Sequence, residues 1–208
     1  MNGIAAGEAR RSRGMEAHRT GLEAQQDLEL LRRAREADDP QAFKELYRRH
    51  REPVLGFLSR LLGEPQAAED VLQETFLRVH QHMDRHDLRQ PFRPWLFRIA
   101  RNLGINALRA KGKPGRATGG EATGAAATSD RVPRDAARSE SRDAARAALE
   151  ALPAETRALL IQRHGLGMKL EELAASWEVN ERTIRTRLQA AVDQLTQALL
   201  AQRAGGVA

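Results

Sequence analysis

Apolar side chains recur every three or four residues through most of this chain, and this spacing constrains its fold more than any other feature. The steps are clear at Leu28 and Leu31, and again at Leu72, Phe76 and Val79. Such steps put apolar side chains on one face of a helix, and no segment alternates as a strand would. We therefore predict an all-α protein, with helices near residues 22–36, 40–62, 65–83 and 92–110.

Capping and breaking residues support these boundaries. Asp39 stands before Pro40, which is an N-cap followed by a proline at the first helical position. Gly63 suits the end of one helix and Pro65 the start of the next. Pro53 falls inside the helical pattern, so we expect it to kink or break its helix.

The helical pattern is interrupted by a long stretch of small and turn-forming residues, KGKPGRATGGEATGAAATSDRVPRDAAR. Val132 is its only large apolar side chain, which is typical of a linker. We predict two small helical domains joined by a flexible linker, each close to the lower size limit for a self-sufficient core. The predicted segments are a disordered tail over 1–20, a first domain over 21–110, the linker over 111–143, a second domain over 144–201 and a tail over 202–208.

Charge favours a polyanionic partner. The chain has 34 Lys and Arg against 28 Asp and Glu, a net charge of +6, so nucleic acid leads and a membrane surface is second. The absence of cysteine excludes disulfides and thiolate zinc sites. No apolar run approaches the roughly 20 residues of a membrane helix, and the N-terminus lacks the apolar core of a secretory signal. We expect a cytoplasmic protein with no direct membrane insertion.

The segment KLEELAASWEVNERTIRTRLQAAVDQL has the spacing of a helix-turn-helix. We predict a short helix from about Lys169 to Trp177 and a longer one that begins near the N-cap Asn180. The expected shared core consists of Leu170, Leu173, Ile184 and Leu188. The outer side of the second helix then carries Arg182, Arg185, Thr186 and Gln189. Arg can bind guanine and Gln adenine in a major groove, although a helical hairpin with a solvated charged face would show the same pattern.

Two neighbouring segments of the first domain carry opposite charge. Acids outnumber bases five to two over residues 51–74, whereas nine bases stand against one acid over residues 85–116. On a helix, Asp70, Gln73 and Glu74 share one side, which is free to meet a basic protein. An ordinary solvated helix face would have the same composition.

The basic segment includes PFRPWLFRIARNLGIN, where aromatic rings alternate with arginines. This combination is typical of single-stranded nucleic acid binding, since cations contact phosphates and rings stack on bases. We expect Ile99 and Leu103 to attach the helix to the core, while Trp95 could serve either the core or DNA. The side chains expected to be available for opened DNA are Arg93, Arg98, Arg101, Asn102 and Asn106.

An acidic helix, a basic aromatic helix, a linker and a helix-turn-helix follow one another in this order. In this arrangement the chain resembles a bacterial RNA polymerase sigma factor of the extracytoplasmic-function (ECF) group of the sigma-70 family. AAEDVLQETFLRVHQHMDRHD is similar to the core-binding helix of that family, and FRPWLFRIARNLGINALR to its promoter-melting helix. ALPAETRALLIQRHGLGMKLEELAASWEVNERTIRTRLQAA is similar to the domain that binds the minus-thirty-five element. The resemblance covers about residues 27–110 and 144–200.

The resemblance implies a sigma factor that binds core RNA polymerase and directs promoter-specific initiation. It assigns the contact with the coiled coil of the largest polymerase subunit to Asp70, Gln73 and Glu74. It assigns minus-ten DNA to Arg93, Trp95, Arg98, Arg101, Asn102 and Asn106, with the loop 85–90 helping to hold a flipped base. It assigns minus-thirty-five bases to Arg185, Thr186 and Gln189, and nearby phosphates to Arg182, Thr183 and Arg187. It implies no cofactor, no metal and no catalytic residue, and it suggests an anti-sigma factor as a further partner.

Two features depart from the family. Ala67 stands where the family commonly has an acid, so one polar contact with polymerase is expected to be missing. The recognition helix also runs into QAAVDQLTQ, which is less basic than usual and predicts low affinity or unusual specificity for upstream DNA.

Two other classes of protein fit the sequence less well. A stand-alone helix-turn-helix regulator leaves the acidic helix without a task. A metalloenzyme using His80, His82 and His86 has no H-E-x-x-H motif and no thiol to support it.

The linker length bears on the arrangement of the two domains. Two turns of DNA separate promoter elements by roughly 70 Å, whereas a free coil of about 30 residues spans only about 30 Å. We therefore expect the free protein to be compact or variable in domain arrangement, and polymerase to extend the linker.

Overall fold

The computed structural model describes residues 21–37, 39–111 and 144–205, and every regular element in these ranges is helical. The all-α prediction is therefore confirmed. The predicted N-terminal tail and nearly all of the predicted linker lie outside the described residues, as do residues 206–208. The helix that ends the chain continues to Gly205, past the predicted domain end at 201.

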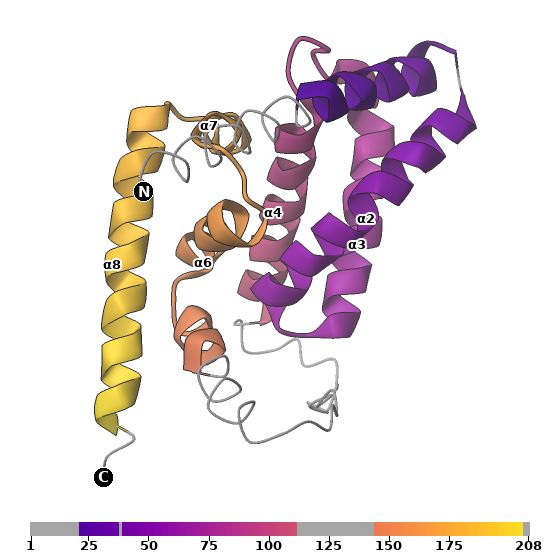
Figure 1. Ribbon diagram of the computed structural model, residues 1–208. Coiled ribbons are helices and arrows are strands. Elements are labelled where there is room, and N and C mark those ends of the chain that lie inside the picture. Colours follow the sequence, from indigo (N-terminus) through magenta and orange to yellow (C-terminus); the bar gives the residue numbers. More distant parts are fainter. Residues whose placement is uncertain (1–20, 38, 112–143, 206–208) are drawn as a thin grey trace, which may run out of the picture.

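The N-terminal unit contains four long helices and one short turn (Figure 1). They are a helix over residues 21–36, α2 (Pro40–Leu62), α3 (Pro65–His82), a 3-10 turn (Met83–Arg85) and α4 (Phe92–Lys111). The Asp39 side chain accepts hydrogen bonds from the backbone N–H groups of Gln41 and Ala42 at 3.0 and 3.2 Å, as the N-cap prediction requires. Gly63 ends α2 in the left-handed conformation, with φ 72°.

Of the kink or break expected at Pro53, the break does not occur, because α2 continues without interruption to Leu62. Proline removes one backbone hydrogen bond from a helix, a local cost that packing can offset. The next turns bury Val54, Phe57 and Leu58 completely, and this burial stabilises the helix past the proline.

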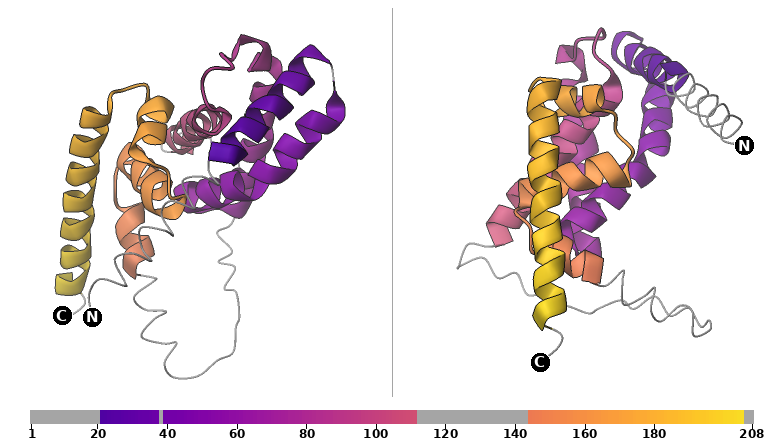
Figure 2. Two further views of the ribbon diagram at one scale, coloured as in Figure 1. Left: turned by 45° about the horizontal axis from the view of Figure 1, so that its top comes forward. Right: turned by 60° about the vertical axis from the view of Figure 1, so that its left-hand side comes forward.

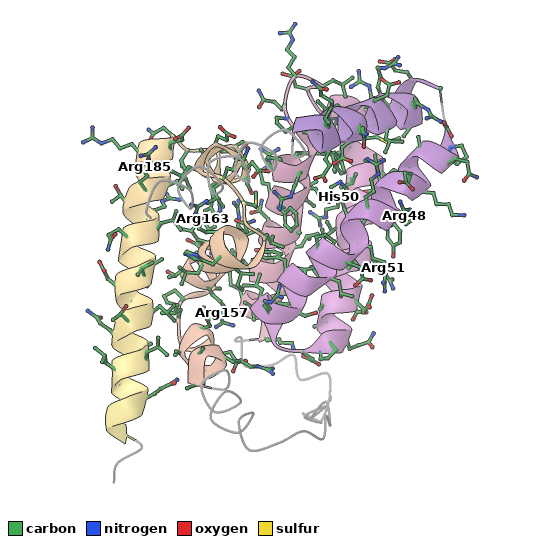
Figure 3. The ribbon with its side chains drawn as sticks, viewed as in Figure 1. Arg48, His50, Arg51, Arg157, Arg163 and Arg185 are labelled. Atoms are coloured by element: carbon green, nitrogen blue, oxygen red, sulfur yellow. The ribbon has the colours of Figure 1, made fainter. Side chains whose placement is uncertain are left out.

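The 21–36 helix is attached to α2 by a buried polar pair. His50 Nε2 lies 2.7 Å from Asp27 Oδ2, and both residues are buried. The His50 ring also meets the Phe92 ring edge to face at 5.2 Å. His50 therefore joins three helices, and Figure 3 shows it in the interior of this unit.

The C-terminal unit contains the predicted helix-turn-helix. Its elements are a helix over residues 144–150, α6 (Ala154–Leu160), a π-helical turn (Ile161–Gly165), α7 (Leu170–Trp177) and α8 (Glu181–Gly205). The Asn180 side chain caps α8 by accepting a hydrogen bond from the Thr183 backbone N–H at 2.8 Å. Both the start of the second helix and its cap are therefore confirmed.

The two units pack against each other, with α4 between α2 and α3 on one side and the C-terminal unit on the other (Figures 1 and 2). One continuous apolar cluster includes Leu61 and Phe97 from the first unit and Ile161 and Leu173 from the second. The structure therefore presents α4 as a central helix with two covered sides.

Arg157 strengthens the contact between the units. Its guanidinium donates to the carbonyl of Leu61 in α2 at 3.0 Å and to the carbonyl of Leu152 at 3.2 Å. Figure 3 shows Arg157 beside the C-terminal end of α2. Burial of this side chain lowers the pKa of Arg157.

Candidate nucleic-acid interface

The recognition helix α8 has an open outer face. Arg182, Arg185, Thr186 and Gln189 are exposed, while Ile184 is completely buried. Figure 3 shows Arg185 pointing away from the rest of the molecule. The face predicted for major-groove DNA is thus exposed.

Three of these side chains make contacts within α8. Arg185 pairs with Glu181 at 3.2 Å, Gln189 donates to Asp193 at 3.1 Å, and Thr186 donates to the Arg182 carbonyl at 3.2 Å. These contacts are exposed, so they are weak and exchange readily for contacts with DNA. Thr183 is half-buried, and its hydroxyl donates to the side chain of the N-cap Asn180 at 2.9 Å, whereas the Arg187 guanidinium lies 6.0 Å from the Trp177 ring centroid.

The core-facing side of α4 differs from the expectation. The residues that attach α4 to the core are Phe92, Leu96, Phe97 and Ala100, all completely buried. Ile99 is half-buried and packs against the edge of this core, whereas Leu103 is half-buried outside it, so the predicted pair supplies only part of the attachment. At Gly104, α4 comes so close to α2 that an added Cβ would lie 2.8 Å from Leu61 Cδ2.

Trp95 lies at the edge of the core. It is half-buried, and its ring stacks on the His86 ring with centroids 4.4 Å apart. His86 is buried in the loop before α4, and its Nε2 lies 3.0 Å from the Gln90 carbonyl. Trp95 thus forms one wall of a cavity of about 440 Å³ that the loop 85–90, Arg98 and Glu178 also line.

Two of the α4 arginines contact the C-terminal unit. Arg93 donates to a Glu172 carboxylate oxygen at 2.8 Å and to the Leu166 carbonyl at 2.8 Å. Arg98 forms an ion pair with Glu178, the residue after α7. Both arginines are therefore engaged within the chain.

Arg101 is the most enclosed of the three. It is 8% exposed, donates to the Ser176 carbonyl at 2.8 Å and lies over the Trp177 ring, 4.2 Å from the centroid. Burial lowers the pKa of Arg101 to about 10. The expectation that Arg101 is available to opened DNA is wrong for this conformation, because α7 covers it.

Asn102 and Asn106 remain exposed on the same helix. They line a cavity of about 370 Å³ together with Arg109 of α4 and Trp177 and Arg187 of the helix-turn-helix. The cavity thus brings together residues predicted for two different promoter elements. It exists because the two units pack against each other.

The acidic face of α3 is open. Asp70 and Gln73 are exposed, and Glu74 is half-buried in an ion pair with Arg78 at 2.7 Å. Leu77 continues this face one turn further and is 51% exposed. In the structure this face combines carboxylates with an exposed leucine that sequence reasoning missed.

Two of the three histidines considered as metal ligands take up other contacts. The His80 ring meets the Phe43 ring edge to face at 5.2 Å, and the His86 ring stacks on Trp95. Over the described ranges, no three His, Cys, Asp or Glu side chains are grouped to hold a metal ion. In the same part of the chain, no helix is both long and apolar enough to span a bilayer.

Sequence reasoning missed the partners of the arginines. Glu172 and Glu178 lie in the helix-turn-helix, where their charge looked like ordinary helix-surface charge. No signal in the sequence identifies them, because the left-handed conformation of Glu178, with φ 54° where glycine is usual, is visible only in the structure.

Two family models match the chain, one in each helical unit. A model described as "Sigma-70 region 2" matches residues 46–113, and one described as "Sigma-70, region 4" matches residues 142–195. The first includes α3 and α4, and the second includes the helix-turn-helix.

The chain is similar to several curated sigma factors. It is 34% identical over 154 residues to the ECF RNA polymerase sigma factor SigL of Mycobacterium tuberculosis, covering 72% of this chain and 84% of SigL. It is 36% identical over 73 residues to the ECF RNA polymerase sigma factor SigW of Bacillus subtilis, covering 35% of this chain. The chain spans only 39% of SigW and 60% of the SigE factor of Mycolicibacterium smegmatis.

A solved structure has the same fold over most of the chain. CnrH, in complex with the cytosolic domain of CnrY, superposes with a TM-score of 0.62 at 26% identity. The match covers 85% of this chain and 98% of that chain. The arrangement of both helical units therefore has an experimental counterpart.

Proposed function

Because the chain belongs to the ECF group of the sigma-70 family of RNA polymerase sigma factors, we propose that it binds core RNA polymerase and directs it to specific promoters. Sequence recognition is its contribution, and phosphodiester bond formation belongs to polymerase. The chain itself then needs no catalytic residue, and it acts in the cytoplasm, where polymerase works.

The exposed acidic face of α3 is the observation that carries this proposal. Asp70, Gln73 and Glu74 lie on an acidic face of α3, whereas the neighbouring α4, proposed to bind DNA, is basic. The same chain also carries a helix-turn-helix. A regulator that binds DNA alone gains nothing from such a face, because its carboxylates repel phosphates. A basic coiled coil of the largest polymerase subunit is a partner of complementary charge.

Promoter recognition divides between the two units. The face of α8 with Arg185 and Gln189 binds the minus-thirty-five element in the major groove, while Arg182 and Arg187 bind phosphates. The exposed face of α4 with Asn102 and Asn106, joined by Trp95 and the arginines, captures minus-ten bases as the duplex opens. Unstacking costs a few kcal/mol per step, and each captured base returns about 1–3 kcal/mol.

An antagonist protein is a further proposed partner. CnrH, which shares this fold at 26% identity, is solved in complex with the cytosolic domain of CnrY. By analogy, we place an anti-sigma factor on the surface of this chain. The partner would compete with polymerase or DNA for the faces named above.

Transcription with purified core polymerase tests the proposal. Fragmented genomic DNA from the bacterium that encodes the chain is transcribed with and without the protein, and the 5′ ends of the transcripts are sequenced. We expect a set of start sites that depends on the chain and shares two upstream sequence elements. Tight binding to bare duplex DNA without any polymerase-dependent start site would instead support a stand-alone regulator.

A further inference from the structure

The helix over residues 21–36 carries none of the residues proposed above to bind polymerase or promoter DNA. It precedes the segment matched by the region 2 family model, which begins at residue 46. It is nevertheless built into the unit, because Leu31 is completely buried and Asp27 pairs with His50. Figure 1 shows this helix, in indigo, beside the loop that leads into α4. Its contacts indicate a task at that loop.

Arg35, near the end of this helix, reaches the loop across 51 positions of sequence. Its guanidinium donates to the His86 carbonyl at 3.1 Å, and its side chain is half-buried. The donor is charged, so this hydrogen bond is stronger than one between neutral groups. The loop over 85–90 connects the 3-10 turn to α4, and its carbonyls are therefore not held by a helical ladder. Arg35 holds one of them in place.

Three further contacts fix His86 itself. Its backbone N–H donates to the Met83 carbonyl at 3.2 Å, and its Nε2 lies 3.0 Å from the Gln90 carbonyl. Because a carbonyl oxygen can only accept, Nε2 carries the hydrogen. The ring stacks on Trp95, with centroids 4.4 Å apart and 23° between the planes. A shift of the His86 backbone would therefore move the ring that supports Trp95.

A second route runs from the same helix to Trp95. Asp27 Oδ2 lies 2.7 Å from His50 Nε2, and the His50 ring meets the Phe92 ring edge to face at 5.2 Å. Phe92 is the first residue of α4 and is completely buried, and its ring lies 5.9 Å from the Trp95 ring. The helix over 21–36 thus supports Trp95 from two directions, through the loop and through the start of α4.

Trp95 and the loop are walls of the cavity of about 440 Å³ described above. A base that leaves the stack is recognised by the shape of its pocket and by hydrogen bonds to its edge, so the position of the walls determines which base fits. Arg35 contacts the wall through the His86 backbone. Its effect on the cavity therefore passes through His86 and does not require contact with DNA.

We propose that the helix over residues 21–36 positions the His86–Trp95 wall of this cavity, and that Arg35 is the positioning residue through which it sets base preference in the minus-ten element. The inference rests on the proposed function for the identity of the captured base. The contact between Arg35 and the loop is a property of the free chain, so it can be tested without polymerase.

Three substitutions separate this role from a general effect of charge. Arg35→Met removes the guanidinium and keeps an apolar stem, so it preserves packing. Arg35→Lys keeps one charged donor. The matched control, Arg32→Met, removes a guanidinium from an exposed position on the same helix, where Arg32 pairs with Glu29 and Glu36. Circular dichroism establishes that each variant is folded.

Base preference is measured with holoenzyme assembled from each full chain. Promoters found in the transcription experiment are varied one position at a time in both elements. We expect Arg35→Met to reduce the preference for the favoured base at one minus-ten position by roughly fivefold, a part of what the loss of one charged hydrogen bond can cost. Arg35→Lys should fall between Arg35→Met and the parent, and Arg32→Met should match the parent. Preferences in the minus-thirty-five element and affinity for core polymerase should stay the same in all of them.

The titration of His86 in the free chain tests the contact itself. Burial lowers the pKa of His86, and the positive charges of Arg35 and Arg98 lower it further. Removing the Arg35 charge and loosening the loop should therefore raise the titration midpoint of His86 in Arg35→Met. The midpoint is measured by NMR, with the His86 signal assigned by its absence from His86→Phe. Arg32→Met should leave the midpoint where it is.

Minus-ten preferences of Arg35→Met equal to those of the parent would overturn the proposal. A change of the same size in Arg32→Met would reduce the effect to net charge and overturn it as well, and so would a uniform loss at every position of both elements. The proposed function fails separately, by the absence of chain-dependent start sites. The base preference would then fall with it, while the His86 midpoint would still decide whether Arg35 holds the loop.

Discussion

The Arg101 guanidinium lies 4.2 Å from the centroid of the Trp177 ring, so a residue of the first unit stacks on a residue of the second. The same guanidinium caps the C-terminal end of α7 by donating to the Ser176 carbonyl at 2.8 Å. A cation at this end of a helix also meets the negative end of its dipole. Arg101 therefore stabilises the packing of α7 against α4, although the same side chain is proposed to hold promoter DNA.

Replacing Arg101 by alanine should loosen the contact between the units. The change leaves the Ser176 carbonyl without its donor and uncovers the Trp177 ring, at a cost of about 1–2 kcal/mol. In a Trp95→Phe background, where Trp177 is the only tryptophan, the emission maximum should shift to longer wavelength. Arg109→Ala, at an exposed position on the same helix, is the control, and an identical spectrum for both variants would contradict the expectation.

The helices and their ends could be predicted because their signals are local. Asp39 and Asn180 each act on backbone groups two or three residues away, so the sequence alone identifies them as caps. Apolar spacing likewise predicts the helices of the first unit and the two of the helix-turn-helix, since it depends only on residues a few positions apart. Pro53 is the exception, because packing of the next turn overrides its local effect.

The environment of α4 could not be predicted in the same way. Periodicity assumes one buried face, but α4 packs against α2 and α3 on one side and the C-terminal unit on another. The partner of Arg101 lies 75 positions away in sequence, beyond the linker. No local pattern indicates which residue will cover such a side chain, so Arg101 was expected to be open.

The acidic face of α3 should control affinity for polymerase. The variant Asp70→Ala/Gln73→Ala/Glu74→Ala should weaken binding to core polymerase by at least about 1.4 kcal/mol, a factor of ten. Its thermal unfolding should stay close to that of the parent, because Asp70 and Gln73 are exposed. Binding is measured by fluorescence polarisation, with Glu29→Ala/Glu36→Ala as a control that removes the same number of carboxylates from the 21–36 helix. Equal affinity of the two variants would exclude this face as the polymerase contact.

The recognition helix should control upstream specificity without affecting polymerase binding. Arg185→Ala and Gln189→Ala should each cost about 1–3 kcal/mol at the upstream element and relax the base preference there. Gln197→Ala, further along α8 at another exposed position, should leave both properties unchanged. The measurement is holoenzyme affinity for promoters found in the transcription experiment, with the upstream element intact or scrambled. A uniform loss on both templates would assign these side chains to phosphate contacts.

His86 should make the loop before α4 sensitive to acid. Desolvation in the stack with Trp95 lowers the pKa of His86 below its ordinary value of 6.5. Between 6.5 and the lower folded pKa, the unfolded chain binds more protons than the folded chain, so stability falls as pH falls through this window. Each unit of pKa difference corresponds to about 1.4 kcal/mol.

Denaturant unfolding at pH 7.5 and 5.5 should therefore show a larger loss of unfolding free energy for the parent than for His86→Phe. This variant keeps an aromatic ring beside Trp95 but cannot take a proton. An NMR titration should place the titration midpoint of His86 below pH 6.5. A midpoint above that value, with equal pH dependence of stability in the two proteins, would show that solvent reaches the ring and that the loop is not closed over it.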